Sequence, residues 1–294
     1  MERDHSKVVV PSNMMKHPIS REVNMQERTK VQLTNVQETL LLTLYAKAMD
    51  FRSKESVLND EQAGRILEEI DYDFGKLKRF GRANVLAVRA KQYDDWIREF
   101  LEAKTNTIVL NLGCGLDTRI TRVHPPEGVG WFDIDYPEVV QLRRNFFSNR
   151  PGYTMIESSI TNPEWLKEIP VDRPVLIVAE GVLEYLSEAD VKALLNRITS
   201  HFLHGQLMFD VMNSHAVESG RSRASFPTGA LHLWAVDDLN EVDKLDTRLK
   251  RMTEVSLFKS PYFRKLPWEF RSLYGLISLM PRYTNMMRLL RYQF

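Results

Sequence analysis

The stretch "TIVLNLGCGLDTRITRV", residues 107–123, indicates how this chain folds. A run of apolar, mostly β-branched residues leads into Gly113, and Gly115 follows two positions later. Glycine adopts positive φ angles without strain and lets a backbone approach a ligand closely. In open α/β sheets, ligands bind beyond the carboxyl ends of the strands, where a strand turns into its helix. A Gly-x-Gly turn also occurs as a tight connection with no ligand, so this signal needs support from the rest of the chain.

Strand-like and helix-like segments alternate from residue 107 onward. Runs rich in β-branched and aromatic residues predict strands at 107–112, 129–135, 153–158, 174–180 and 205–212. Helical patterns lie between them at 136–149 and 187–203, and Ser187 with Asp190 resembles a capping box at the start of the second. This alternation predicts an α/β fold with a mostly parallel sheet that helices cover on both faces.

The first third of the chain is expected to be helical. Apolar residues recur at helical spacing over 37–51, 59–74 and 84–103, and no strand-like segment separates these three helices. Asn59 is the expected N-cap of the second helix. Near the end of the chain, 232–258 is typical of a helix followed by a strand, and 267–294 ends in a helix or a strand.

The chain has no linker long enough to mark a domain boundary, so we expect a single domain over 1–294. It would comprise a helical cap region (1–105), a ligand-binding core (106–212) and a cap insertion that completes the sheet (213–294). The helices of 30–80 and 212–232 are expected to cover the ligand pocket.

Composition favours a soluble, cytoplasmic protein. The formal net charge is +1, and acidic and basic residues are intermixed, so the sequence shows no basic stretch typical of binding to nucleic acid or an anionic membrane. The only cysteine excludes an internal disulfide and fits a reducing compartment. The first 23 residues lack the ~7–15 apolar residues of a signal peptide, and no run approaches the ~18 of a membrane span. We expect neither nucleic acid nor a membrane as partner, and the oligomeric state stays open.

A carboxylate lies at the end of the second predicted strand. Asp135 follows Gly113 by 22 positions, the spacing at which an acid accepts hydrogen bonds from the ribose hydroxyls of a nucleoside cofactor. Asp133 lies on the same face of the strand, but Asp135 is nearer to the ligand end. Asp135 could also cap the following helix, where Pro137 suits the first turn.

The glycine turn favours a cofactor without phosphates. The dinucleotide fingerprint needs a third glycine, and here Thr118 stands in its place. Asp117 would also repel phosphates at the helix N-terminus. S-adenosylmethionine has no phosphate and carries a cationic sulfonium, so a methyltransferase is favoured over a dehydrogenase. Cys114, between the two glycines, is interpreted as a small residue that fills the turn.

A further carboxylate, Glu180, closes the predicted strand 174–180 and is followed by Gly181. By itself it could be a charged strand end that meets solvent. Together with the glycine turn and Asp135 it falls at the same edge of the sheet, which favours a functional site.

Seven segments together resemble the leucine carboxyl methyltransferase family, in particular its bacterial branch of tetracenomycin-type polyketide O-methyltransferases. They occur in the family's order over residues 38–186: "ETLLLTLYAKAMD", "NDEQAGRILEEIDYDF", "VRAKQYDDWI", "VLNLGCGLDTRITRV", "WFDIDYPEVVQLRR", "SSITNPEW" and "PVLIVAEGVLEYL". The resemblance implies a class I S-adenosylmethionine-dependent methyltransferase: a seven-stranded, Rossmann-like sheet with an added helical cap.

The resemblance also assigns roles to residues of this chain. Arg89 falls where the family's arginine holds the carboxylate of the cofactor, and a guanidinium suits that bidentate contact. The remaining cofactor contacts implied are Gly113 and Gly115 on the loop, Asp135 at the ribose, Ser159 and Ile160 beside the adenine, and Glu180 near the amino-acid end. Tyr185 would shape the acceptor pocket.

Three positions depart from the family pattern. Ser159 stands where the eukaryotic enzymes carry an acid beside the adenine. The family's N-terminal lysine has no clear match, because Lys47 is nearby but out of register. Glu184 occupies a position that is usually apolar; it is either a solvated helix residue or a carboxylate that faces the substrate and disfavours an anionic acceptor.

These observations predict methyl transfer from S-adenosylmethionine to a carboxylate or hydroxyl oxygen of a small molecule, such as a polyketide-like metabolite, with S-adenosylhomocysteine as product. A carboxylate is already ionised at pH 7 and needs no base, whereas a phenol benefits from one, for which His215 is the candidate. His201 and His204 lack an acidic partner set, so no metal is expected. The alternatives are a protein C-terminal carboxyl methyltransferase and a non-catalytic scaffold that keeps the fold.

Overall fold

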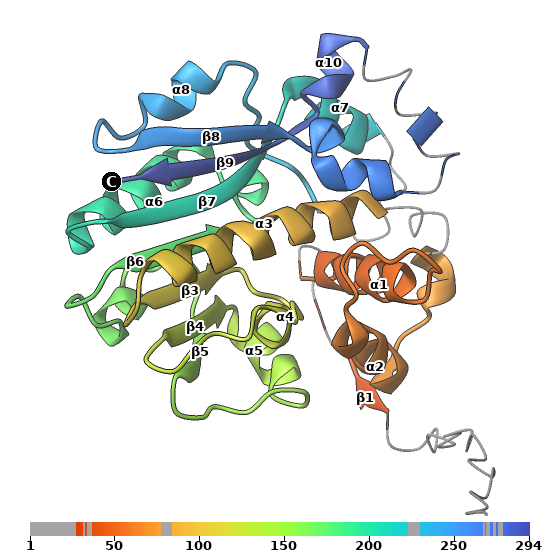
Figure 1. The fold of residues 1–294 in the computed structure, drawn as a ribbon, viewed down its shortest axis with the longest axis horizontal. Coiled ribbons are helices and arrows are strands. Elements are labelled where there is room, and N and C mark those ends of the chain that lie inside the picture. Colours follow the sequence, from red (N-terminus) through yellow and green to blue (C-terminus); the bar gives the residue numbers. More distant parts are fainter. Residues whose placement is uncertain are drawn as a thin grey trace, which may run out of the picture.

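The computed structural model describes residues 28–31, 33, 37–77, 84–222, 230–266, 268, 271–272, 275 and 279–294. Its centre is a seven-stranded sheet with the order β5-β4-β3-β6-β7-β9-β8 (Figure 1). The strands are β3 (Ile108–Leu112), β4 (Gly130–Asp135), β5 (Tyr153–Glu157), β6 (Val175–Ala179), β7 (Gly205–Met212), β8 (Lys250–Ser256) and β9 (Met287–Gln293).

Strands β3 to β7 are parallel, and only β9 runs antiparallel to its two neighbours. The order reverses at β3, which lies between β4 and β6, and such a switch point is where open α/β sheets bind ligands. Strands β3 and β6 are buried along their whole length. Buried parallel strands are continuously apolar because helices cover both faces of the sheet.

Helices cover the two faces with separate cores. On one face, Val109 and Leu176 belong to the core that includes α3 (Asn84–Ala103) and α5 (Pro137–Arg143). On the other face, their sequence neighbours Ile108 and Ile177 pack in the core that includes α6 (Glu188–His201) and α8 (Leu239–Asp243). This alternation follows from the period of two residues in a strand.

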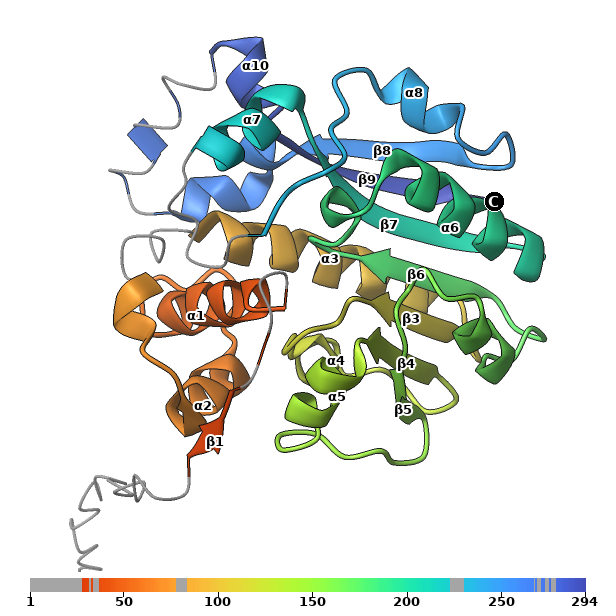
Figure 2. The same ribbon diagram turned by 180° about the vertical axis from the view of Figure 1, so that it is seen from behind.

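The cap elements gather beyond the carboxyl ends of the parallel strands (Figures 1 and 2). They are α1 (Thr39–Phe51), α2 (Glu61–Glu69), the short α4 (Arg119–Val123), α7 (Ser214–Ser222), α10 (Pro281–Thr284) and the 3-10 turns η4 (Leu183–Tyr185) and η5 (Leu257–Lys259). Helix α1 packs against both α2 and α3. The cap thus lies over the sheet edge at which the ligand site was expected.

The predicted α/β fold with a seven-stranded sheet is confirmed, and each strand predicted between 107 and 212 is present. Ser187 caps α6 as expected, since its hydroxyl accepts from the Asp190 N–H at 3.1 Å. The prediction for Asn59 was wrong: Asp60 is the N-cap of α2, and Asn59 has a left-handed φ of 56°.

One further difference concerns strands. The first third contains a short parallel pair, β1 (Thr29–Lys30) with β2 (Ile70–Asp71), where no strand was expected. At the end of the chain, where a helix or a strand was expected, the structure has the strand β9. The expectation about a signal peptide concerns residues outside the described part. Within the described part, no helix has the length and apolarity needed to cross a membrane.

Candidate cofactor and acceptor site

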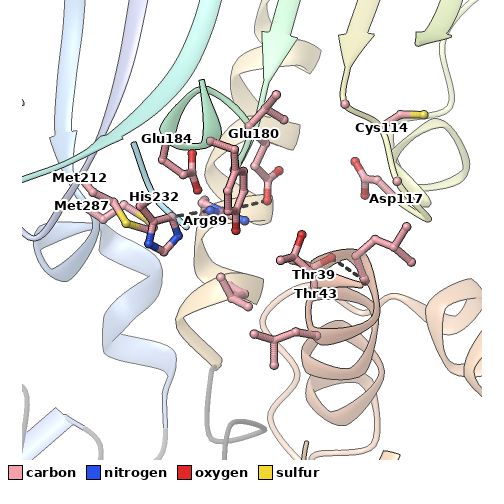
Figure 3. Close-up of a pocket in the computed structure, with 18 of the residues that line it drawn as sticks. Thr39, Thr43, Arg89, Cys114, Asp117, Glu180, Glu184, Met212, His232 and Met287 are labelled. Atoms are coloured by element: carbon pink, nitrogen blue, oxygen red, sulfur yellow. Dashed lines mark hydrogen bonds and ion pairs between the residues drawn. The ribbon is translucent and has the colours of Figure 1, made fainter. Parts of the chain in front are cut away.

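A cavity of about 600 Å³ opens over the carboxyl ends of the parallel strands (Figure 3). Its size falls within the roughly 300–1,000 Å³ of ligand sites. In Figure 3, Cys114 and Asp117 lie on one side of Arg89, and Met212, His232 and Met287 lie on the other. The cavity therefore has a polar end at the loops after β3 and β4, and an apolar end under the cap.

The glycine loop after β3 has the backbone conformation that the sequence indicated. Gly113 and Gly115 have φ angles of +61° and +50°. A Cβ atom on Gly113 would lie 2.5 Å from Val182 Cγ2, and one on Gly115 would lie 3.1 Å from Leu40 Cβ. Both glycines are thus required by the left-handed backbone and by protein packing, in addition to any approach to a ligand.

Asp135, at the end of β4, lines the cavity and braces the glycine loop. Its carboxylate accepts from the Gly115 N–H and the Tyr136 N–H, both at 2.7 Å. The N-cap position of α5 is Tyr136, so Asp135 does not cap the helix. Burial raises the pKa of Asp135 to about 6, against the two backbone hydrogen bonds, which lower it.

Asp133, the alternative on the same strand, does not line the cavity. It is fully buried and accepts hydrogen bonds from Asn111 at 3.0 Å, Tyr153 at 2.7 Å and Arg143 at 2.5 Å. These contacts satisfy both of its oxygens within the protein, so Asp135 is the acid at this strand end that a ligand can reach.

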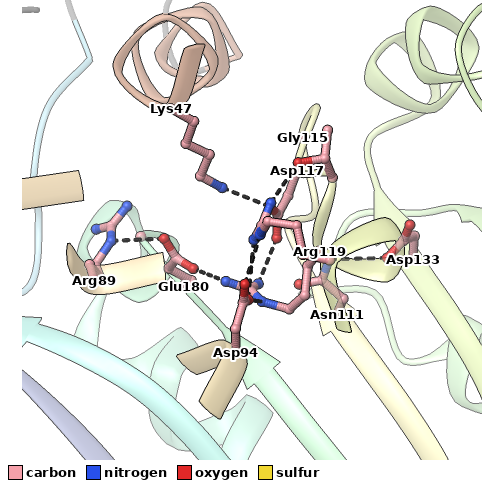
Figure 4. A network of polar contacts seen from close by, with 12 residues as sticks. Lys47, Arg89, Asp94, Asn111, Gly115, Asp117, Arg119, Asp133 and Glu180 are labelled. Atoms are coloured by element: carbon pink, nitrogen blue, oxygen red, sulfur yellow. Dashed lines mark hydrogen bonds and ion pairs between the residues drawn. The ribbon is translucent and has the colours of Figure 1, made fainter. Parts of the chain in front are cut away.

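Glu180 lies at the centre of a buried ion network (Figure 4). Arg89 Nε donates to one of its oxygens at 3.0 Å, and Arg119 contacts the other. Burial by itself would raise the pKa of Glu180, but the cations, with Arg119 first, hold it at about 2. Glu180 is therefore an anion at neutral pH.

The network extends in both directions from Glu180. Arg119 also pairs with Asp94 at 2.9 Å and with Asp117 at 2.6 Å. Arg89 also pairs with Asp210 at 3.1 Å. Four cations (Lys47, Arg89, Arg119 and Arg122) face five carboxylates (Asp60, Asp94, Asp117, Glu180 and Asp210). With every group ionised, the network as a whole therefore has a formal charge of −1.

Lys47 is a site residue that the sequence analysis considered and set aside as out of register. It projects from α1, is 4% exposed, lines the cavity and pairs with Asp117 at 2.7 Å. Lys47 follows Leu40 and Leu44 at helical spacing, which places a lysine on the buried face of α1. That position was the available signal, because a buried lysine needs an anionic partner.

Glu184 lies at the apolar end of the cavity and is buried, so its interpretation as a solvated residue was wrong. It belongs to η4, and its backbone oxygen accepts from the Leu233 N–H at 2.7 Å. Its Oε2 atom has no hydrogen-bond partner among the described residues. Burial, and then Asp210, raise the pKa of Glu184 to about 8.

Tyr185 and His215 line the apolar end as predicted, and His232, which was not predicted, joins them. The rings of Tyr185 and His232 lie 5.1 Å apart, and His215 packs edge-on against Tyr283 at 4.9 Å. His232 lies in an irregular segment 47 residues beyond Tyr185, so no local pattern marked it.

The structure places the remaining predicted residues as follows. Ile160 lines the cavity, but Ser159 does not: its hydroxyl is 2.8 Å from Thr161 Oγ1, and Ser158 lines the cavity instead. Cys114 is buried, and burial raises the pKa of its thiol, which fits a packing role. His201 packs edge-on against Phe202. No group of three metal-ligating side chains occurs in the described ranges.

Comparison with known proteins gives a consistent family. Residues 41–199 match the model of leucine carboxyl methyltransferase. The tetracenomycin polyketide synthesis O-methyltransferase TcmP of Streptomyces glaucescens is 36% identical over 90% of this chain and 98% of its own. The S-adenosyl-L-methionine-dependent methyltransferase dpfgK of Gibberella zeae is 32% identical over 74% of this chain and 80% of its own. A crystal structure from Thermobifida fusca, assigned as a methyltransferase, shares the fold with a TM-score of 0.56 and 15% sequence identity. The match covers 86% of this chain and 93% of that chain.

Proposed function

Because this chain belongs to the leucine carboxyl methyltransferase family, we propose that it methylates a carboxyl or hydroxyl oxygen of a small-molecule acceptor. Both relatives are named as methyltransferases, the Gibberella protein as one that depends on S-adenosylmethionine, and the chain is an enzyme of that class. The name of the Streptomyces relative places that protein in polyketide synthesis, which supports a polyketide-like acceptor here.

The charge at the polar end of the cavity is the observation that carries the proposal. S-adenosylmethionine has a sulfonium, an ammonium and a carboxylate, which sum to one positive charge. The network beneath the cavity has one negative charge to match it. The glycine loop also lacks the third glycine that the dinucleotide fingerprint needs for its diphosphate.

The residues that line the polar end suit the parts of this cofactor. Asp135 would accept from the ribose hydroxyls, and Ile160 with Ser158 would adjoin the adenine. Glu180, an anion at neutral pH, would attract the ammonium group. Arg89 would hold the carboxylate while it keeps its pairs with Glu180 and Asp210.

When bound, the cofactor supplies an electrophilic methyl group. The protein's task is then to hold the acceptor oxygen in line with that methyl group and to exclude water. Such positioning is worth effective molarities of ~10⁵ M or more in model reactions. An acceptor carboxylate, with a reference pKa of ~4, would need no base, whereas a hydroxyl group would need its proton removed.

Calorimetry tests the cofactor, and a labelled methyl group tests the reaction. We expect S-adenosylmethionine and S-adenosylhomocysteine to bind, and NAD not to bind. NAD binding without S-adenosylmethionine binding at millimolar ligand would overturn the proposal. Label from the cofactor should appear on a small carboxylic acid or phenol, and base treatment distinguishes an ester from an ether. Label found only on protein C-termini would favour a protein carboxyl methyltransferase instead.

A further inference from the structure

The acceptor end of the cavity contains a buried carboxyl group, Glu184, with an unused hydrogen-bonding oxygen (Figure 3). The side chain is 3% exposed and lines the cavity. Its backbone oxygen is bonded to the Leu233 N–H, which ties η4 to the segment that carries His232. Buried polar atoms without a partner are rare in proteins because they lose hydration without compensation. A ligand in the cavity that Glu184 lines would supply a partner for this carboxyl group.

The charges around Glu184 disfavour an anionic acceptor. Each cation that the described lining contains is already paired: Lys47 with Asp117, Arg119 with Asp117 and Glu180, and Arg89 with Glu180 and Asp210. A carboxylate acceptor at this end would meet the Glu184 carboxyl and, among the described lining residues, no cation that lacks an acidic partner. A neutral acceptor avoids this repulsion.

Beside Tyr185, His215 and His232, this end has several apolar and aromatic side chains. They include three methionines and two aromatic residues, Met212, Met286, Met287, Phe258 and Tyr283. Methionine fills irregular spaces and makes favourable contacts with aromatic rings. A flat, apolar ring system with a hydroxyl group satisfies both this lining and the Glu184 carboxyl.

We propose that Glu184 is the general base that takes the proton of a neutral, aromatic hydroxyl acceptor during methyl transfer. In this step the acceptor oxygen forms a bond to the methyl carbon, and the bond from that carbon to sulfur breaks with its electron pair on sulfur. The hydroxyl proton passes to Glu184 Oε2, so the products are a methyl ether, a neutral sulfide and a protonated glutamate. The inference rests on the proposed methyltransferase function and narrows its acceptor class.

The environment of Glu184 suits proton transfer near neutral pH. The titratable groups that act on it are Asp210 of β7, Glu180 after β6 and Arg89 of α3, and the Tyr185 phenol follows it in sequence. Burial and Asp210 raise its pKa to about 8, whereas Arg89 lowers it. A base is most effective when its pKa lies near the working pH. The positive charge of a bound sulfonium would favour ionised Glu184 further.

The test compares 2-naphthol, 2-naphthoic acid and a nitronaphthol that is already ionised at pH 7. Wild type is compared with Glu184→Gln, His215→Asn and the matched control Glu188→Gln, an exposed glutamate four positions further on. We expect wild type to form a base-stable ether from 2-naphthol. Glu184→Gln should lower kcat on 2-naphthol by about 10²–10⁴-fold. It should leave the ionised nitronaphthol nearly unaffected, and Glu188→Gln should behave as wild type on both.

Calorimetry on the four proteins separates the two levels of inference. If wild type does not bind S-adenosylmethionine, the proposed function fails. If it binds, three results overturn the role of Glu184: preferred esterification of 2-naphthoic acid, an equal loss on neutral and ionised naphthols, or a selective loss in His215→Asn instead. If no label is transferred, the affinities of 2-naphthol and 2-naphthoic acid for the complex of the protein with S-adenosylhomocysteine are compared instead. Tighter binding of 2-naphthol supports the proposal, and tighter binding of 2-naphthoic acid or binding of neither rejects it.

Discussion

Replacing Gly181 with alanine is expected to displace Arg89 from the position in which it would hold the cofactor. Gly181 has a φ of +67°, and its N–H donates to Asp210 at 2.8 Å. An added Cβ atom would lie 2.8 Å from Arg89 Nη2 and 3.0 Å from Nη1. A flexible arginine could swing away, but this one is 4% exposed and pinned by ion pairs to Glu180 and Asp210. The clash must therefore disturb the ion pairs as well.

Two effects of different size follow from this geometry. The left-handed backbone costs an alanine about 1–2 kcal/mol of unfolding free energy. The loss of one charged hydrogen bond from Arg89 to the cofactor carboxylate costs about 1.5–3 kcal/mol of binding free energy. This corresponds to an increase of roughly 10- to 150-fold in the Kd for S-adenosylmethionine.

Gly128→Ala is the matched control, because Gly128 also has a positive φ, +87°, and its Cβ would meet only Asn106 Cα at 4.0 Å. Urea unfolding should show a stability loss in both variants, and calorimetry should show weaker cofactor binding in Gly181→Ala alone. Decarboxylated S-adenosylmethionine, which lacks the group that Arg89 would hold, should bind wild type and Gly181→Ala equally. Unchanged affinity for S-adenosylmethionine in Gly181→Ala would refute the role of Arg89.

Other predictions concern the loop, the cap and α6. Protonation of Asp135, whose pKa is about 6, should weaken cofactor binding as the pH falls from 7 to 5, by at most about tenfold per pH unit. Asp135→Asn should bind the cofactor weakly at both pH values. If calorimetry shows that the affinity of this variant still falls with pH, Asp135 is not the cause. Lys47→Met should lower the free energy of unfolding, measured in urea, by about 3 kcal/mol. This is the low end for a broken buried ion pair, because Asp117 keeps its pairs with two arginines. A loss below about 1 kcal/mol would contradict this reasoning. Ser187→Ala should cost about 0.5–2 kcal/mol of unfolding free energy and leave cofactor affinity unchanged, because Ser187 caps α6 and does not line the cavity.

The cofactor end was predictable because its signals are local. The glycine turn follows β3, and an acid follows or ends each of the two strands that flank it, β4 and β6. The places of all three are fixed once the sheet is parallel. Gly113, Asp135 and Glu180 all line the cavity for this reason. The strands themselves were predictable because each is a short apolar run between turn residues.

The acceptor end was less predictable because long-range packing forms it. The burial of Glu184 depends on the segment that carries Leu233, which bonds to its backbone from 49 positions away. Lys47 enters the cavity only because α1 packs over the glycine loop and pairs with Asp117, 70 residues further on. Ser159 does not line the cavity for a local reason: its hydroxyl lies against Thr161, and Ser158 lines the cavity instead.

The two ends of the cavity are built from different kinds of structural element. Gly113, Asp135 and Glu180 are attached to strands that hold the sheet together, so changes there put the whole protein at risk. His215 and Tyr283, at the other end, belong to short helices outside the sheet. Selection can therefore alter the acceptor by changing these helices while the donor chemistry is inherited intact. For protein engineering, segments exchanged between relatives at α7 and α10 offer a route to new acceptors on an unchanged methyl donor platform.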